Sequence, residues 1–342
     1  MRWQNQTLDA DDGALPGLER AGFVRTVRTP DFEGITFHEV LCKSALNRMP
    51  EGSGLPFKWT VNPIRGCSHA CRYCFARPTH EYLDLDAGRD FDSQLVVKTN
   101  IAAVLRRELR GRSWRREPVA LGTNTDPYQR AEGRYRLMPG IIGALTESGT
   151  PFSILTKGTL LRRDLPLLIR SARQVRVSVA VSLAMLDPQL QAEVEPGTPT
   201  PRARLELIAA LADAGFAVQI LVAPVLPHLT DGRAQLDELF AALAAAGARS
   251  AVAFPLHLRG ATRGWYLDWL ARAHPTLPSA YRRLYRGAYV IPEYADWLRE
   301  RVAPLLERHG LERVSRAGDP EDSQGDDPRI PLAAQSQLAL FP

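Results

Sequence analysis

The sequence predicts an α/β fold, an incomplete barrel of six strand–helix units, and three observations support this prediction. Short runs of β-branched or other apolar residues recur through the middle of the 342-residue chain. Each run is followed by a longer segment with helical spacing. Several of these segments close on a glycine such as Gly149 or Gly215, which can end a helix in the left-handed conformation. Six units are too few for a closed eight-stranded barrel.

The predicted strands are buried and parallel, because their apolar runs are nearly continuous rather than alternating. These strands cover residues 57–61, 118–122, 152–156, 175–182, 217–223 and 251–256. The predicted helices cover residues 101–109, 138–147, 161–171, 202–214, 235–245, 265–273 and 292–310.

The chain divides into four segments. Residues 1–56 form an N-terminal extension, in which two alternating runs at residues 23–28 and 35–40 predict a hairpin. Residues 57–260 form the barrel, and residues 261–314 are expected to pack on it as a helical segment. Residues 315–342 are acidic and poor in apolar side chains, so we expect a disordered tail.

Composition favours a globular protein of the reducing cytoplasm. The chain is 45% hydrophobic and 24% charged, and no window of eighteen residues is continuously apolar. The N-terminal residues lack the apolar core of a signal peptide. We therefore expect a cytoplasmic protein that makes no contact with a membrane.

The net charge of +5 is unevenly distributed. Residues 57–316 carry 36 Lys and Arg against 25 Asp and Glu, a net charge of +11. Such a surface suits a polyanionic partner, although a solvated basic surface is the ordinary explanation.

Three of the four cysteines stand close together, at Cys67, Cys71 and Cys74, and no cysteine follows them. An iron–sulfur cube held by three cysteines leaves one iron open to another ligand, whereas structural zinc is closed by four protein ligands. A zinc site completed by His69 or His80 is an alternative, and three unrelated buried thiols are another.

The Cys-x₃-Cys-x₂-Cys run at the end of the first strand resembles the motif of the radical S-adenosylmethionine (SAM) superfamily. Within it, the chain is most similar to the branch that contains spore photoproduct lyase and proteins labelled DNA repair photolyases. The flanking pattern, from Arg65 to His80, resembles an actinobacterial subfamily without an assigned function. The resemblance covers roughly residues 55–260.

The resemblance implies two cofactors, a [4Fe–4S] cluster on the three cysteines and SAM on the fourth iron. It also implies reductive cleavage of SAM to a 5′-deoxyadenosyl radical, with an electron from a flavodoxin- or ferredoxin-type partner. Most of the candidate residues for SAM binding lie at strand ends, whereas Tyr73 lies in the cysteine motif and Arg202 and Arg204 lie at the start of a helix. The candidates are Tyr73, Gly122, Thr123, Asn124, Thr125, Asp126, Lys157, Ser182, Arg202, Arg204, Val222, Ala223 and Pro224.

Some of these residues have a structural explanation instead. Tyr73 could pack beneath the cysteine motif, and Asp126 could cap a turn ahead of Pro127. Arg202 and Arg204 could be ordinary surface arginines of a helix.

The chain also departs from the lyase. Thr123 stands where the lyase has the cysteine that returns a hydrogen atom, and Phe75 stands where it has a tyrosine. Without a cysteine after Cys74, a lyase-type closure of the radical reaction is not expected.

The substrate must be argued from weaker signals. Residues 110–116 interleave four arginines with Trp114, and residues 281–289 interleave three arginines with three tyrosines. Such segments can bind phosphates and stack on bases, although amphipathic helix ends give the same pattern. The run from Gln337 to Phe341 resembles the peptide with which bacterial repair proteins bind the sliding clamp.

Three functions follow from these observations. The first is a radical SAM enzyme acting on DNA or RNA, as in DNA repair. The second is a radical SAM enzyme that modifies a protein, a peptide or a small metabolite. The third is a nucleic-acid-binding module stabilised by zinc.

Overall fold

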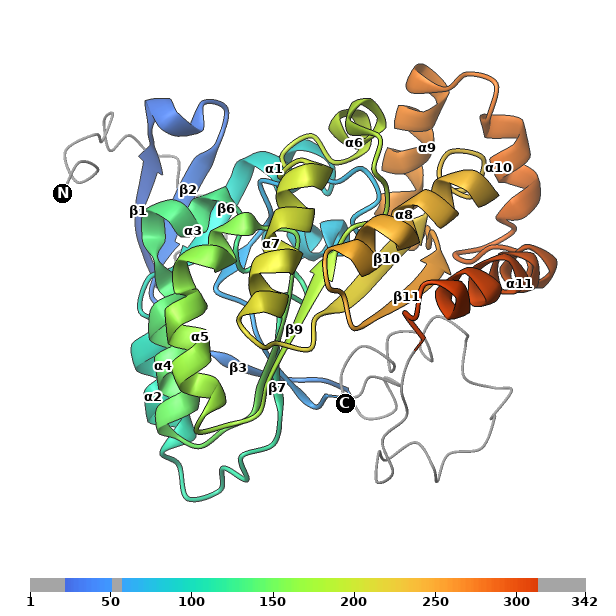
Figure 1. The fold of residues 1–342 in the computed structure, drawn as a ribbon. Helices are drawn as coiled ribbons and strands as arrows, with labels where there is room; N and C mark the ends of the chain where they lie inside the picture. The colour runs from blue at the N-terminus through green and yellow to red at the C-terminus, as the bar shows by residue number, and fades with distance from the viewer. Residues whose placement is uncertain (1–21, 51–56, 313–342) are drawn as a thin grey trace.

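The computed structural model describes residues 22–50 and 57–312. Its main sheet has seven strands in the order β11-β10-β9-β8-β7-β4-β3 (Figure 1). Six are mutually parallel and confirm the predicted incomplete barrel: β4 (Trp59–Val61), β7 (Val119–Leu121), β8 (Phe152–Thr156), β9 (Val177–Ser182), β10 (Gln219–Val225) and β11 (Ser250–Pro255). The seventh, β3 (Leu46–Arg48), pairs antiparallel with β4 at one edge.

Helices connect successive strands and pack along the sheet (Figure 1). They are α2 (Ile101–Leu109), α3 (Arg130–Tyr135), α4 (Leu137–Glu147), α5 (Leu165–Ala172), α6 (Pro188–Val194), α7 (Pro201–Asp213) and α8 (Arg233–Ala245). In α4, Met138, Ile141, Ile142 and Leu145 are buried at the spacing of one helix face. Helix α7 starts where the Thr200 hydroxyl accepts a hydrogen bond from the backbone of the first turn.

The N-terminal hairpin is present and belongs to a second, four-stranded sheet that the sequence analysis did not predict. The order of this sheet is β1-β2-β6-β5. Its strands are β1 (Phe23–Arg28), β2 (Thr36–Val40), β5 (Ile64–Arg65) and β6 (Gln94–Lys98). Strand β2 belongs to the N-terminal extension and β6 to the barrel segment. Their pairing therefore joins the two segments that were expected to divide after residue 56.

Short helices complete the chain between these strands. They are η2 (Pro30–Phe32), η3 (Arg77–Leu83) and η4 (Thr159–Asp164), which are 3₁₀-helices, and α1 (Arg89–Ser93).

The C-terminal helices follow β11. They are α9 (Ala261–Ala273), α10 (Pro278–Leu284) and α11 (Pro292–Arg308). Helix α11 packs against β11 and α8, while α9 contacts η3. The acidic tail and its clamp-like peptide lie outside the described residues. No helix within residues 22–50 and 57–312 is long and apolar enough to cross a membrane.

A small apolar cluster lies on the inner face of the barrel, apart from the large core between sheet and helices. Its buried members are Phe57, Ala120, Leu221 and Ala223. Phe57, Leu221 and Ala223 of this cluster also line the cavity described below.

Candidate active site

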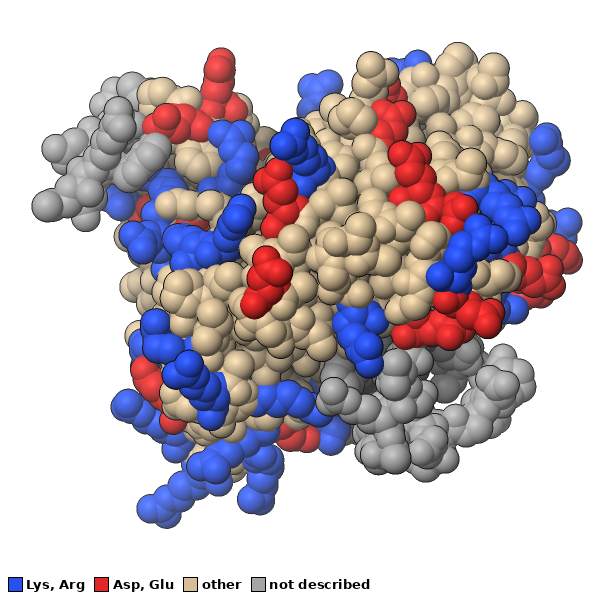
Figure 2. All heavy atoms as spheres, in the orientation of Figure 1, with Lys and Arg blue, Asp and Glu red and all other residues tan. Residues whose placement is uncertain are grey.

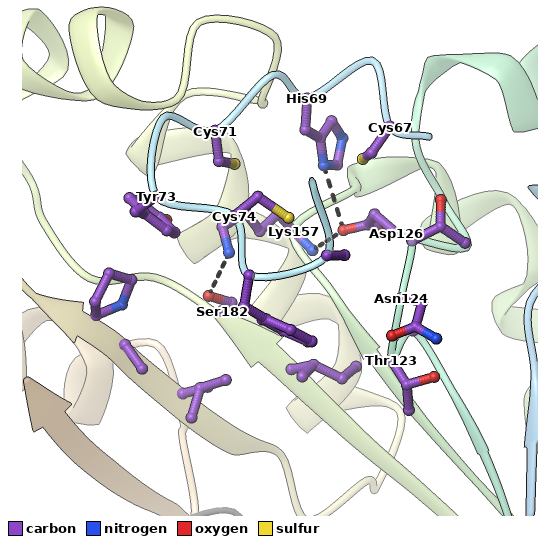
Figure 3. Close-up of a pocket in the computed structure, with 18 of the residues that line it drawn as sticks. Cys67, His69, Cys71, Tyr73, Cys74, Thr123, Asn124, Asp126, Lys157 and Ser182 are labelled. Carbon is purple, nitrogen blue, oxygen red and sulfur yellow. Dashed lines mark hydrogen bonds and ion pairs between the residues drawn. The ribbon is translucent and has the colours of Figure 1, made fainter. Parts of the chain in front are cut away.

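A cavity of about 370 Å³ lies at the carboxyl ends of the barrel strands. It brings together residues from several segments that are far apart in the sequence, among them the cysteine loop, residues 67–74 (Figure 3). Of the predicted site residues, those that line it are Cys67, Cys71, Tyr73, Cys74, Gly122, Thr123, Asn124, Thr125, Asp126, Lys157, Ser182, Ala223 and Pro224. Arg202, Arg204 and Val222 do not line it.

The cysteine loop is held from beneath by buried side chains. The fully buried Arg77 guanidinium donates to the Cys71 carbonyl (2.9 Å) and pairs with Asp92 (2.9 Å). The Thr262 hydroxyl donates to the Cys74 carbonyl (3.0 Å). These hydrogen bonds hold the backbone of the loop in place, and its thiols face the cavity.

The three cysteine sulfurs are directed toward a common space (Figure 3). Burial raises the pKa of Cys71 well above its ordinary range. Burial, with Cys67 next in effect, raises the pKa of Cys74 to about 11. Buried thiols of this kind ionise when a metal binds them, because a coordinating metal deprotonates a thiol. The three cysteines are therefore the residues that could hold a metal–sulfur centre.

Of the two histidines near the cysteines, His69 interacts with Asp126 and with Cys67, and His80 with a backbone carbonyl. His69 Nδ1 lies 3.4 Å from Asp126 Oδ2, and His80 Nε2 lies 2.9 Å from the Gln94 carbonyl oxygen. Within the described ranges, 22–50 and 57–312, no three His, Cys, Asp or Glu side chains are grouped for a single metal ion. Three thiols around a wider space fit an iron–sulfur cluster better than one zinc ion.

Asp126 ties the end of β7 to the end of β8 and to the cysteine loop. Its carboxylate accepts hydrogen bonds from Thr156 Oγ1 (2.5 Å), the Lys157 backbone (2.7 Å) and the Tyr128 backbone (2.9 Å). Burial acts to raise the pKa of Asp126, but His69, the Lys157 backbone and Thr156 lower it to about 2. Burial acts to lower the pKa of His69, but Asp126 raises it to about 10. The pair is therefore ionised at neutral pH, and Asp126 also caps its turn as the structural alternative anticipated.

Two buried amides that the sequence analysis did not single out hold the same region. Asn62 Oδ1 accepts hydrogen bonds from Thr123 Oγ1 (3.2 Å) and the Asn124 backbone (3.1 Å). Gln129 Oε1 accepts one from the Ser68 backbone (2.8 Å). The only sequence signal for Asn62 was its place directly after a predicted strand, and Gln129 had none.

Lys157 reaches the cavity from the end of β8. Its Nζ donates to Ser182 Oγ (2.9 Å) and lies 5.7 Å from the centroid of the Tyr73 ring. Lys157 thus meets two other residues implicated by the resemblance, each from a separate segment. A partly buried ammonium group at this place suits a ligand with an anionic group.

A buried ion pair supports Tyr73 from behind. The Tyr73 hydroxyl donates to the Glu195 carboxylate, and Arg204 Nη2 lies 2.6 Å from the other Glu195 oxygen. Burial acts to raise the pKa of Glu195, but Arg204 and then Lys157 lower it to about 2. Arg204 also donates to the Ser182 carbonyl (3.1 Å). The structure therefore makes Arg204 a positioning residue behind the cavity.

Two other predicted residues lie away from the cavity. Arg202 is exposed and forms an ion pair with Glu206 one helical turn along α7 (3.1 Å), as an ordinary surface arginine would. Val222 is fully buried, whereas Ala223 and Pro224, next on the same strand, line the cavity.

Part of the cavity lining is apolar. The apolar side chains are those of Met49, Phe57, Leu155, Leu221 and Phe254. The cavity thus combines thiols, a cation and a polar turn with apolar side chains. Such a lining is typical of a site for a ligand with both charged and flat apolar parts.

The backbone around Gly197 admits no side chain. A Cβ at this position would lie 2.0 Å from the Ser68 carbonyl oxygen in the cysteine loop. We expect Gly197→Ala to lower the free energy of unfolding by about 1–3 kcal/mol, because loop and turn must separate. Urea denaturation measures this. Gly264→Ala is the control, since nothing lies within 4 Å of that Cβ in α9, and it should stabilise by about 0.5–1 kcal/mol. Equal stabilities for the two variants would contradict the close packing.

Several known proteins are similar to this chain. Uncharacterised proteins of Mycobacterium tuberculosis and Mycobacterium bovis are each 66% identical over 327 residues, which cover 94% of this chain and 96% of theirs. An uncharacterised protein of Acidianus two-tailed virus is 27% identical over 255 residues, or 71% of this chain and 83% of its own.

Among solved structures, spore photoproduct lyase complexed with dinucleoside spore photoproduct aligns with a TM-score of 0.60. The two chains are 14% identical, and the alignment covers 80% of this chain and 79% of the lyase. This likeness concerns the fold. The sequence model of the radical SAM superfamily matches residues 61–240, more than half of the chain and the whole region from β4 through most of α8. The chain therefore belongs to the radical SAM superfamily and is a radical SAM enzyme.

Proposed function

We propose that Cys67, Cys71 and Cys74 hold a [4Fe–4S] cluster, that SAM binds beside it, and that the enzyme acts on a nucleic acid, as in DNA repair. When bound, the cluster and SAM supply reductive cleavage of SAM to a 5′-deoxyadenosyl radical, with an electron from a flavodoxin- or ferredoxin-type partner. The observation that carries the proposal is the cavity that unites the three thiols with Lys157 and the turn after β7. We also propose that the enzyme works in the cytoplasm.

The polar and apolar parts of the cavity lining match the two halves of SAM. Lys157 is placed to attract the methionyl carboxylate, and residues 123–126 offer hydroxyl, amide and carboxylate groups to the amine. Tyr73, Ala223 and Pro224 offer flat or apolar surface to the adenine. The bonds of Asp126, Asn62 and Glu195 hold these groups in place before a ligand arrives, which reduces the entropy lost on binding.

Of the two arginine–aromatic segments, one lies away from the cavity. Residues 110–116 precede β7, at the amino end of its strand, where Figure 2 shows basic side chains gathered at the lower left. Trp114 packs edge-to-face on Trp59 (5.4 Å between ring centroids) and donates to Thr150 Oγ1. This segment can attract phosphates, but its indole is used for packing.

In this proposal, the last step of the reaction, the return of a hydrogen atom, differs from that of the lyase branch. Thr123 lines the cavity, and its hydroxyl donates to Asn62. Phe75, which follows the last cluster cysteine, is 51% exposed and also lines the cavity. Neither side chain offers a thiol or phenol hydrogen, so we propose that another group returns the hydrogen atom.

The test is the dependence of SAM cleavage on nucleic acid. Anaerobically reconstituted enzyme is reduced in the presence of SAM, with and without single-stranded, duplex or damaged DNA, and 5′-deoxyadenosine is measured. We expect formation of 5′-deoxyadenosine and an increase with one class of DNA. If no nucleic acid binds or changes the rate, the substrate class is wrong, and modification of a protein, peptide or small metabolite becomes the better proposal.

Docking of the peptide from Gln337 to Phe341 on the sliding clamp also stays a proposal. It rests on the sequence, because this peptide lies outside the described residues.

A further inference from the structure

Three aromatic side chains form a continuous row beside the cavity. Phe254, at the end of β11, stacks on His257 with their ring centroids 5.5 Å apart and their planes 18° apart. His257 in turn meets Tyr289 edge-to-face, with the centroids 5.0 Å apart. Phe254 and His257 line the cavity, and Tyr289 is 36% exposed. This aromatic row therefore runs from the cavity lining toward solvent.

A basic residue stands at the outer end of the aromatic row. The Arg259 guanidinium carbon lies 5.0 Å from the centroid of the Tyr289 ring, and the guanidinium donates to the Tyr289 hydroxyl. Arg259 is exposed and also lines the cavity. Residues 256–291 carry six arginines against one acid, Asp268. The segment that follows β11 is thus strongly basic.

Hydrogen bonds to backbone carbonyls hold the aromatic row in place. The Leu258 backbone donates to the Ala288 carbonyl (2.8 Å), and the Tyr285 hydroxyl donates to the Leu256 carbonyl (2.9 Å). Arg263 Nη2 also donates to the Tyr285 carbonyl (2.9 Å). Two segments about thirty residues apart are therefore held side by side, so the rings are positioned before any ligand binds.

The aromatic row can stack on a flat neutral group. Burial, with Arg259 next in effect, lowers the pKa of His257 to about 4, so the imidazole is neutral at physiological pH. Neutral rings beside an arginine are the combination with which proteins bind unpaired bases and their phosphates. A single flipped-out nucleotide, rather than a duplex, is the form in which enzymes take a base into a recessed site of this kind.

We propose that the aromatic row and Arg259 form the substrate subsite, which takes an unpaired nucleobase on the row and its phosphate on Arg259. This inference rests on the proposed action on nucleic acid. It assigns recognition of the substrate to residues 254–289, on the β11 side of the cavity, whereas the cysteine loop and the ends of β7 to β10 serve SAM.

The test measures binding of a fluorescent single-stranded oligonucleotide to the reconstituted enzyme by anisotropy, over a series of salt concentrations. We expect Tyr289→Leu and Arg259→Gln each to weaken binding at least about fivefold, the lower bound for loss of one stacked base. Arg259→Gln should also lower the slope of log affinity against log salt by about 0.7, because one phosphate contact is lost. Tyr289→Phe keeps the ring and should bind as tightly as the parent enzyme within about twofold.

Arg282→Gln is the matched control, since Arg282 is an exposed arginine of α10 in the same basic segment. It should bind the oligonucleotide about as tightly as the parent enzyme. If Arg282→Gln weakens binding as much as Arg259→Gln, the attraction is diffuse and no subsite exists. If Tyr289→Leu loses SAM binding in the same proportion as oligonucleotide binding, the row belongs to the SAM site and the inference is wrong.

Two further outcomes separate this inference from the proposed function. If the parent enzyme binds no oligonucleotide, the action on nucleic acid fails and the subsite with it. If the parent enzyme binds and both Tyr289→Leu and Arg259→Gln bind equally well, the action on nucleic acid stands and only the subsite is wrong.

Discussion

Replacing Cys71 with alanine is expected to reduce bound iron and sulfide sharply and to bring 5′-deoxyadenosine formation to background. The thiol of Cys71 is buried and faces the same space as those of Cys67 and Cys74, so two thiols would remain for a cluster that needs three. Iron and sulfide analysis of anaerobically reconstituted protein measures the first effect, and chromatography of the reaction products measures the second.

Cys42→Ala is the control for this prediction. Cys42 lies between β2 and β3, where its backbone bonds with the Asn100 side chain, and it does not line the cavity. Its replacement should leave iron content and 5′-deoxyadenosine formation unchanged. Retention of a full complement of iron by Cys71→Ala would contradict the assignment of the cluster to these three cysteines.

The second large effect is expected from the ion pair behind Tyr73. Replacing Arg204 with methionine removes the cation from a fully buried pair and leaves the Glu195 carboxylate without it. We expect the free energy of unfolding to fall by about 3–5 kcal/mol, because a buried charge loses its partner. Urea denaturation followed by circular dichroism measures this change.

Arg202→Met provides a matched comparison in the same helix. Its pair with Glu206 is exposed, so the loss should stay within about 0.5 kcal/mol. The double variant Arg204→Met with Glu195→Gln should lose less stability than Arg204→Met alone, because the unpaired charge is gone. Similar losses for Arg204→Met and Arg202→Met would show that the buried pair does not support the fold.

Much of the barrel could be predicted because its signals are local. All six runs end within two residues of the observed strand ends, and three of them, including the one that predicted β8 at residues 152–156, end at the observed residue. Parallel strands end at one edge, so the residues after β7, β8 and β9 could be expected to meet even though they are far apart in sequence. The common cavity of Asp126, Lys157 and Ser182 follows this rule.

The second sheet could not be predicted in the same way. The strand β6 is a short run directly before helix α2, and its place depends on parallel pairing with β2, about sixty residues earlier. Such pairing is a property of the folded chain and leaves little mark on either segment alone.

The sequence by itself determined the six strand–helix units, the three-cysteine motif and the absence of any later cysteine, because spacing and composition are local properties. Only the tertiary structure decided which residues share the cavity. It placed Lys157 against Tyr73 and Ser182, Arg204 behind them, and Arg202 on the surface. It also brought Tyr289, which precedes α11, to His257, which follows β11, although α9 and α10 lie between them in the sequence. Burial and contact between distant segments arise only when strands pack together, so the roles of Asn62, Gln129 and Glu195 could not be seen before folding.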